Sequence, residues 1–185
     1  MDRRVVIVEP KASWPTEFEA ISKSLKDALG PLALRVDHIG STAVPGLPAK
    51  DRIDIQLTVA ALDKGRLVPA LASAGFIDQD IGQDHRPPGA GPDANWRKLF
   101  FQAGSGRPVN LHVRAAGMPN QRYALLFRDY LRADPEAAAA YARLKRALAA
   151  LGIDPGVYAD VKDPACDLIY IAAGAWAAKT GWAVR

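Results

Sequence analysis

Hydrophobic residues recur along the chain at two different spacings, and each spacing predicts a different kind of element. Between 53 and 59 apolar and polar residues alternate, which is typical of a strand with one polar face. Between 13 and 30, Phe18, Ile21, Leu25 and Leu29 repeat every three or four residues, as on the buried side of a helix. The same reasoning predicts strands over 5–8, 34–39 and 53–59, a helix over 63–74, a short strand near Phe76, and a hairpin of 96–102 with 108–114.

The second half of the chain is predicted to be mainly helical. From Asn120 onward the apolar positions keep helical spacing, and Asp163-Pro164 has the sequence of an N-cap followed by proline, which predicts a last helix to about Lys179. Residues 80–95 are rich in glycine and proline and predict a long loop. Strands mixed with helices early and helices alone late predict an α/β (α+β) fold, with a small mixed sheet flanked by helices and a helical C-terminal part.

Composition narrows the class of protein. A chain of 185 residues with 49% hydrophobic and 24% charged residues fits one globular domain over 1–185. The single cysteine, Cys166, argues against a disulfide-stapled secreted scaffold and favours a reducing, cytoplasmic location. No apolar run reaches the roughly 20 residues of a membrane span, and the apolar run at the start is too short for a signal segment.

Basic residues are concentrated in one part of the chain. Residues 97–146 contain ten Lys and Arg against three Asp and Glu, whereas the whole chain has 24 against 20. This excess favours an anionic partner. Nucleic acid is disfavoured because no Arg/Gly-rich tail, aromatic ladder or zinc spacing accompanies the basic residues. The sequence gives no indication of the oligomeric state.

A turn-rich segment precedes an acidic position on the next predicted strand. Gly40 permits close backbone approach, and Ser41 and Thr42 offer hydroxyl and N–H groups that suit a phosphate. Asp54 projects from the polar side of the following strand, where a carboxylate can hold Mg²⁺ near that phosphate. A simple turn followed by an exposed strand residue explains the pattern equally well.

A second group of polar residues is expected on the strand 108–114, where period-two spacing puts Asn110, His112 and Arg114 on one face. A histidine beside an arginine can bind phosphate, ligate a metal or shuttle a proton. A lone strand histidine is more often structural, so the functional interpretation requires this strand to lie beside Asp54.

Two helical pairs add further candidates. Arg128 and Arg132 lie one turn apart and suit a phosphate clamp, or pair equally well with neighbouring aspartates. Tyr158 and Lys162 either face a pocket together or are a packed tyrosine and a solvated lysine. His85 has aspartates nearby in sequence, but a Pro/Gly-rich loop is poorly preorganised for a metal.

The segment His38–Leu47, followed by Ala49-Lys50 and Ile53-Asp54-Ile55, resembles the signature of the GrpB-like family. The later motifs follow in the family's order and are Leu111-His112-Val113, residues 127–132, Tyr141, Leu144-Lys145, and Tyr158 with Lys162. The resemblance spans roughly residues 5 to 175. It implies a nucleotidyltransferase-like fold in which the Gly-Ser loop opens a helix beside an acidic strand, and it adds His38 and Lys50 to the phosphate- or nucleotide-binding residues.

The chain departs from the wider nucleotidyltransferase pattern at the acidic positions. Gly40, Ser41 and Asp54 match, but Gln56 and His112 stand where further carboxylates are expected. Two-metal phosphoryl transfer relies on clustered carboxylates, so these residues hold a single Mg²⁺ at best.

The resemblance leaves two functions open. The first is a nucleotidyltransferase-like enzyme that transfers a nucleotidyl or phosphoryl group with Mg²⁺ on Asp54, with His112 as second ligand or proton shuttle and Arg114, Arg128 and Lys162 on the phosphates. The second is a non-catalytic regulatory domain that binds a nucleotide or phosphorylated metabolite. GrpB-like domains also occur joined to dephospho-coenzyme A kinase, which favours a coenzyme A precursor or an adenine nucleotide as ligand.

Overall fold

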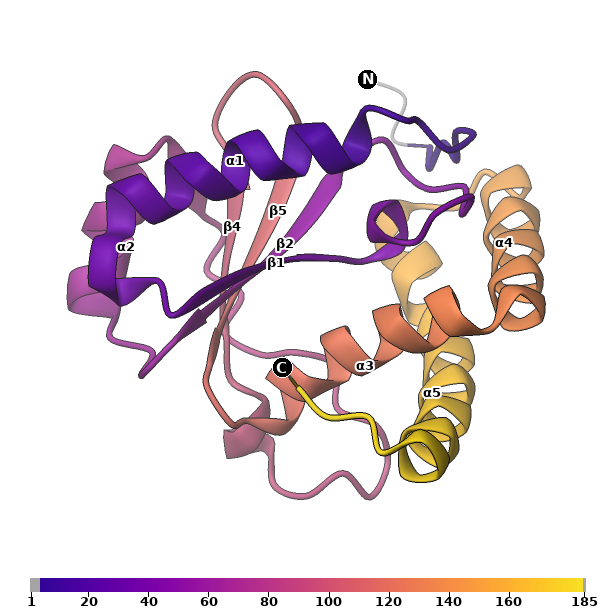
Figure 1. The fold of residues 1–185 in the computed structure, drawn as a ribbon. Helices are drawn as coiled ribbons and strands as arrows, with labels where there is room; N and C mark the ends of the chain where they lie inside the picture. Colours follow the sequence, from indigo (N-terminus) through magenta and orange to yellow (C-terminus); the bar gives the residue numbers. More distant parts are fainter. Residues whose placement is uncertain (1–3, 185) are drawn as a thin grey trace.

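A five-stranded mixed sheet forms the centre of the computed structural model, which describes residues 4–184 (Figure 1). The strands lie in the order β1-β2-β5-β4-β3. β2 and β5 pair in parallel, and the other neighbours are antiparallel. The strands are β1 (Arg35–Ile39), β2 (Ile53–Val59), β3 (Phe76–Asp78), β4 (Leu99–Ala103) and β5 (Val109–Ala115).

Within residues 4–184, five α-helices surround this sheet (Figure 1). They are α1 (Trp14–Leu29), α2 (Lys64–Ser73), α3 (Pro119–Ala133), α4 (Pro135–Ala150) and α5 (Pro155–Thr180), with the short 3₁₀ helices η1 (Gly30–Leu32), η2 (Ser41–Ala43) and η3 (Asp93–Trp96). The helices α1 and α2 cover one face of the sheet, while α3, α4 and α5 gather on the other side. The predicted α/β (α+β) class, with a helical C-terminal part, is confirmed.

The main core lies between the sheet and the first two helices. Ile53, Ile55 and Leu57 of β2 are fully buried there against Leu25 of α1 and Leu71 of α2. Burying an aliphatic side chain of this size contributes roughly 1.5–3 kcal/mol. The apolar side of the alternating pattern is therefore what fixes the sheet beneath α1 and α2.

The polar side of β2 is covered as well, by the C-terminal helices. Gln56 is fully buried, and its side-chain amide donates to the backbone oxygen of Gln121 at the start of α3 (3.2 Å). Its carbonyl oxygen accepts from Arg114 of β5 (2.7 Å). Asp54, nearer the beginning of β2, is only half-buried. The polar face is thus closed along most of β2 and open at one end.

The strand predicted over 5–8 is wrong. Val8 and Ala49 form an isolated antiparallel bridge, and no longer pairing develops. Val5 instead packs against Leu148 of α4 and Tyr158 of α5. A short apolar run fits either role, and here it serves to pack against helices.

The predicted start of the last helix at Asp163-Pro164 is also wrong. Asp154 and Pro155 carry the same signal earlier in the chain, and the Asp154 side chain caps the helix by accepting from the Gly156 N–H (2.7 Å). Pro164 lies inside α5, where it removes one backbone hydrogen bond without ending the helix. No helix of the described residues, α5 included, is long and apolar enough to cross a membrane.

Asp51, just before β2, ties the beginning of α1 to the sheet. Its carboxylate accepts hydrogen bonds from Arg107 (2.6 Å), Lys11 (2.6 Å) and the Trp14 indole (3.0 Å). These donors, Arg107 above all, hold the pKa of the Asp51 carboxyl well below its usual range.

We expect Asp51→Asn to lower the free energy of unfolding at pH 7 by about 1 kcal/mol, because three donors lose a charged acceptor. A carboxyl whose pKa is depressed by folding stabilises the protein above its unfolded pKa of about 3.9 and loses that effect as the pH falls below it. Urea denaturation should therefore show the difference at pH 7 and a smaller one at about pH 3. Asp27→Asn, on the exposed side of α1, is the control. A difference that does not change with pH would contradict the interpretation.

Candidate functional site

A cavity of about 450 Å³ opens where β2 and β5 meet the C-terminal helices, and we call it the Ser41 cavity. Loop 80–95 forms part of its wall through Asp84 and His85. Eight of the eleven residues predicted from the sequence line it, and they are Gly40, Ser41, Lys50, Asp54, His112, Arg114, Tyr158 and Lys162.

Parallel pairing of β2 with β5 brings the two polar groups together. Asp54 lies opposite Asn110, and Gln56 lies opposite His112. The Asn110 amide donates to one oxygen of Asp54 (2.8 Å), while the amide oxygen of Asn110 accepts from Arg52 (3.0 Å). The requirement that the second strand lie beside Asp54 is met.

Gly40 is in direct contact with Asp54. Its φ of +68° is in the left-handed region, and a Cβ placed there would lie 2.5 Å from the second carboxylate oxygen of Asp54. The turn that carries Ser41 therefore packs on the carboxylate with no room for a side chain. Burial raises the pKa of Asp54, against the opposing effect of the Asn110 hydrogen bond.

Lys145 of α4 reaches the same turn from the opposite side of the cavity. Its Nζ lies 2.8 Å from Ser41 Oγ and 2.5 Å from the backbone oxygen of Pro48, and the residue is only 3% exposed. Burial and the positive charge of Lys162 lower the pKa of Lys145 to about 7. Sequence reasoning did not select Lys145 as a site residue. The available signal was a basic residue on the buried stripe of α4, in helical register with Tyr141 and Leu148.

Two further lysines face the cavity. Lys50 lies over the ring of Tyr158, with Nζ 4.4 Å from the ring centroid. Lys162 donates to the Cys166 sulfur (3.3 Å). Burial and the charge of Lys162 lower the pKa of Lys50, whereas for Lys162 the effect of burial is outweighed by Cys166 and Asp163, which raise its pKa.

Arg114 is neutralised by Asp84, one of the aspartates near His85, and no signal in the sequence indicated this pairing. Its guanidinium makes two hydrogen bonds to the Asp84 carboxylate (2.7 and 2.9 Å), and Lys98 binds the same carboxylate (2.9 Å). No local pattern links residue 84 of a loop to residue 114 of a strand, so only the folded chain reveals the pair.

His112 accepts hydrogen bonds at Nδ1. That nitrogen lies 3.4 Å from Lys98 Nζ and 3.3 Å from a guanidinium nitrogen of Arg114, both of which are donors. Burial and the charge of Arg114 lower the pKa of His112 well below its usual value, so the ring is neutral with its proton on Nε2. A metal on Nε2 would require the proton to move to Nδ1, where it would face two donors.

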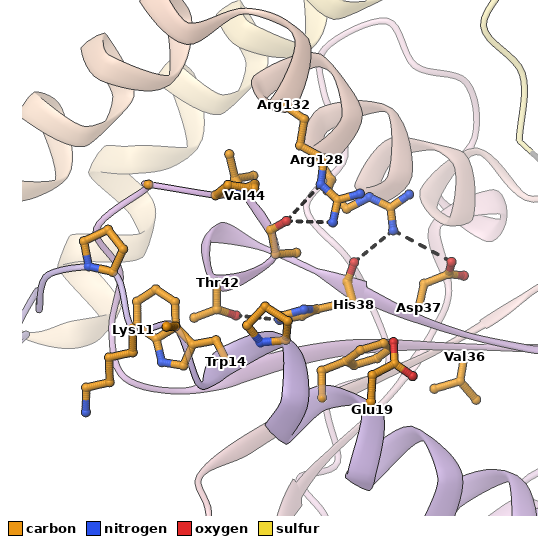
Figure 2. A pocket seen from close by; sticks show the side chains of 17 residues that line it. Lys11, Trp14, Glu19, Val36, Asp37, His38, Thr42, Val44, Arg128 and Arg132 are labelled. Atoms are coloured by element: carbon orange, nitrogen blue, oxygen red, sulfur yellow. Dashed lines mark hydrogen bonds and ion pairs between the residues drawn. The ribbon is translucent and has the colours of Figure 1, made fainter.

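The other three predicted residues lie elsewhere. His38, Thr42 and Arg128 line a separate cavity of about 480 Å³ at the β1 edge, which we call the His38 cavity (Figure 2). His38 stacks on Phe18 (4.7 Å between ring centroids) and its Nε2 lies 2.9 Å from Thr42 Oγ1. Burial lowers the pKa of His38 to about 4. Successive side chains of a strand point to opposite faces, and Ile39 rather than His38 lies opposite Asp54.

The two arginines of α3 contact backbone oxygens on either side of the Gly40-Ser41 turn. Arg128 donates to the backbone oxygen of His38 (2.9 Å), and Arg132 donates twice to that of Ala43 (2.9 and 2.7 Å), as Figure 2 shows. Arg128 also pairs with Asp129 (2.7 Å). Both side chains hold the turn that carries Ser41.

The residues of the Ser41 cavity do not fit a two-Mg²⁺ centre. Within residues 4–184 no group of three or more His, Cys, Asp or Glu side chains is arranged to hold a metal ion. Asp84 and Asp163 also line the cavity, but Asp84 is bound by Arg114 and Asp163 lies beside Lys162 (3.5 Å). Asp54 alone is left beside the Gly40-Ser41 turn.

Comparison with known proteins identifies relatives along most of the chain. The family model described as GrpB protein matches residues 4–171. A dephospho-CoA kinase of Mycolicibacterium paratuberculosis is 42% identical, with the match covering 96% of this chain and 48% of that protein. The UPF0157 protein BH1888 of Halalkalibacterium halodurans is 37% identical over 78% of this chain and 69% of its own length. The chain thus spans about half the length of the kinase relative.

A solved structure shares the fold. The crystal structure of the conserved protein GrpB from Enterococcus faecalis superimposes with a TM-score of 0.73 at 27% sequence identity. The match covers 91% of this chain and 96% of that one. The arrangement of sheet and helices is therefore common to both chains over nearly their whole lengths.

We expect Gly40→Ala to lower the free energy of unfolding by roughly 2–4 kcal/mol, because it adds a clash with Asp54 to the strain of a left-handed backbone. Gly46→Ala is the matched control, since Gly46 also has a positive φ (+73°) but no atom within 4 Å of where the added methyl group would lie. It should cost only about 1–2 kcal/mol. Urea denaturation of both variants measures the difference, and equal losses would show that Asp54 does not press on Gly40.

Proposed function

The chain belongs to the GrpB family, and on that premise we propose that the Ser41 cavity binds a nucleotide or another phosphorylated metabolite. The observation that carries the proposal is the charge balance of the cavity. Lys50, Lys145 and Lys162 lie around Asp54, and Asp163 lies beside Lys162, while the cations Arg114 and Lys98 are offset by Asp84. Five basic side chains thus face three carboxylates, and four face three when Lys145 is neutral. An excess of cations around a cavity favours an anionic ligand.

The size and walls of the cavity support a ligand of nucleotide size. Its volume of about 450 Å³ lies within the usual range of small-molecule sites, roughly 300–1,000 Å³. Aromatic side chains supply flat apolar surfaces on which a base can stack, and they are Trp96, Tyr123, Phe127, Tyr141 and Tyr158. The phosphates would lie toward Lys50, Lys162 and the Ser41 hydroxyl. Relatives named dephospho-CoA kinase make a coenzyme A precursor one of the ligands to test.

The residues of the Ser41 cavity favour binding of the ligand without nucleotidyl transfer. Nucleotidyl transfer through two Mg²⁺ ions needs clustered carboxylates, and Asp54 stands alone beside the turn. Gln56, at the position expected for a second acid, is directed to Gln121 and Arg114 rather than to the cavity. We therefore propose that the ligand is held by lysines and the Ser41 turn, and we assign no step to a metal.

A thermal-shift series tests this proposal with pyrophosphate, ATP and dephospho-coenzyme A as probes and adenosine as the uncharged control. At 100-fold excess over Kd a ligand stabilises by about 2.7 kcal/mol, which is roughly 5–10 °C for a domain of this size. We expect such a shift with at least one phosphorylated probe, in EDTA as well as in Mg²⁺, and none with adenosine at the same concentration.

Charge variants locate the ligand. Lys50→Gln and Lys162→Gln should each raise several-fold the ligand concentration that is needed for a given thermal shift. Lys179, an exposed lysine near the end of α5, which also carries Lys162, supplies the control, and Lys179→Gln should leave that concentration unchanged. No shift with any phosphorylated probe, or equal shifts in all three variants, would reject the site. Mg²⁺-dependent pyrophosphate release that is lost in Asp54→Ala would establish nucleotidyl transfer instead.

A further inference from the structure

The contact between Ser41 and Lys145 goes beyond what phosphate binding requires. The serine hydroxyl and the lysine amine lie 2.8 Å apart on the wall of the Ser41 cavity, the serine half-buried and the lysine buried. We propose that Ser41 is a nucleophile and Lys145 its general base, and that the cavity hydrolyses an activated carboxylic ester. The inference rests on the proposed function only for recognition of an anionic group on that ester by Lys50 and Lys162.

Lys145 Nζ contacts Ser41 Oγ, the Pro48 backbone oxygen and the face of the Tyr141 ring (4.8 Å to the centroid), and both the ammonium and the neutral amine can make these contacts. A neutral amine has two N–H donors and one lone pair. One donor is taken by the Pro48 backbone oxygen (2.5 Å), and the lone pair can then accept the Ser41 hydroxyl proton across the 2.8 Å contact. Among the residues that the structure describes, no carboxylate lies within ion-pair distance of Nζ, and Asp54 favours the protonated amine only from farther away.

The surroundings of Lys145 keep it partly neutral near physiological pH. Burial is the main cause, and Lys162 of α5 adds to it, so that its pKa falls to about 7. Asp54 of β2 and Cys166 of α5 oppose this shift, and Arg146 of its own helix reinforces it. A base whose pKa is close to the working pH is well suited to proton transfer.

Ser41 is also held in place. Its turn is packed on Asp54 through Gly40 and fixed on the other side by Arg128 and Arg132, which bind the backbone oxygens of His38 and Ala43 (Figure 2). A nucleophile needs such support, because a displacement of an ångström costs much of the rate.

The reaction balances without a metal or an added cofactor. Ser41 Oγ attacks the ester carbonyl carbon while Lys145 Nζ takes the hydroxyl proton, and the bond to the leaving alcohol breaks as the ammonium returns that proton to the alcohol oxygen. A water molecule then gives a proton to Nζ and attacks the acyl-serine. The acid is released, and the proton returns to Ser41 Oγ. Serine–lysine pairs are one of the recurring variants of serine catalysis.

A fluorophosphonate probe and p-nitrophenyl acetate test the pair on the full chain. Intact-mass and peptide mass spectrometry should find one fluorophosphonate adduct, on Ser41. Because the neutral amine is the active form, the labelling rate should rise roughly tenfold from pH 6 to pH 8, with a midpoint near 7. Release of p-nitrophenol should follow the same pH profile.

Variants separate the two roles. Ser41→Ala should abolish labelling, and Lys145→Arg, which keeps the charge but is no base in this pH range, should slow it roughly 100-fold or more. Ser24→Ala, an exposed serine of α1, is the matched control and should label like the parent. If Lys145→Arg does not fold, the pH profile of the parent decides.

The outcomes are distinct from those of the binding test. No adduct on Ser41, an unchanged rate in folded Lys145→Arg, or a rate independent of pH would each overturn the nucleophile–base pair. A thermal shift by pyrophosphate in a protein that does not label would leave the binding proposal standing and reject this one. Labelling of Ser41 without a thermal shift by any phosphorylated probe would support the nucleophile–base pair and reject the binding proposal.

Discussion

Parallel pairing of β2 with β5 is the constraint on which the rest of the structure depends. A parallel pair needs a long crossover, and here that connection contains α2 together with β3 and β4. These two strands extend the sheet beyond β5. The same register sets the apolar residues of both strands against α1 and α2, and it sets Asp54 beside Asn110 on the other face. The core and the candidate site are therefore two sides of one pairing.

Much of the fold could be predicted from the chain because β2 and α1 have strong and different hydrophobic periods. Prediction failed where local signals were ambiguous. The apolar run at 5–8 suited a strand as well as a packing segment, and Asp154-Pro155 competed with the identical signal at Asp163-Pro164. Elements with long periodic patterns were therefore recovered, as was the short strand at Phe76, whereas the run at 5–8 and the start of the last helix were not.

The candidate site also combines contacts that strand alternation predicts with contacts that only the folded chain creates. The proximity of Asp54 to the strand of His112 followed from two alternating patterns, once the strands are neighbours. Alternation along β1 also separates His38 from Asp54, yet a single motif had grouped them. Lys145 is 104 positions from the serine that it contacts, so only the folded chain brings the two together. Part of the basic excess over 97–146 is not available to a ligand, because Arg107, Arg114 and Arg132 bind groups of the protein itself.

Loop 80–95 is more than a cover over the cavity. Asp84 is held by Arg114, Lys98 and Asn120, so one carboxylate of the loop offsets two cations, Arg114 of β5 and Lys98 just before β4. His85 next to it binds Asp167 of α5 (2.9 Å), which joins the loop to the helix that also carries Lys162. Withdrawing the loop would break the ion pairs of Asp84 and raise the positive potential of the cavity. The loop is thus the counter-ion of the cavity as well as its wall, and its position sets how strongly the interior attracts negative charge.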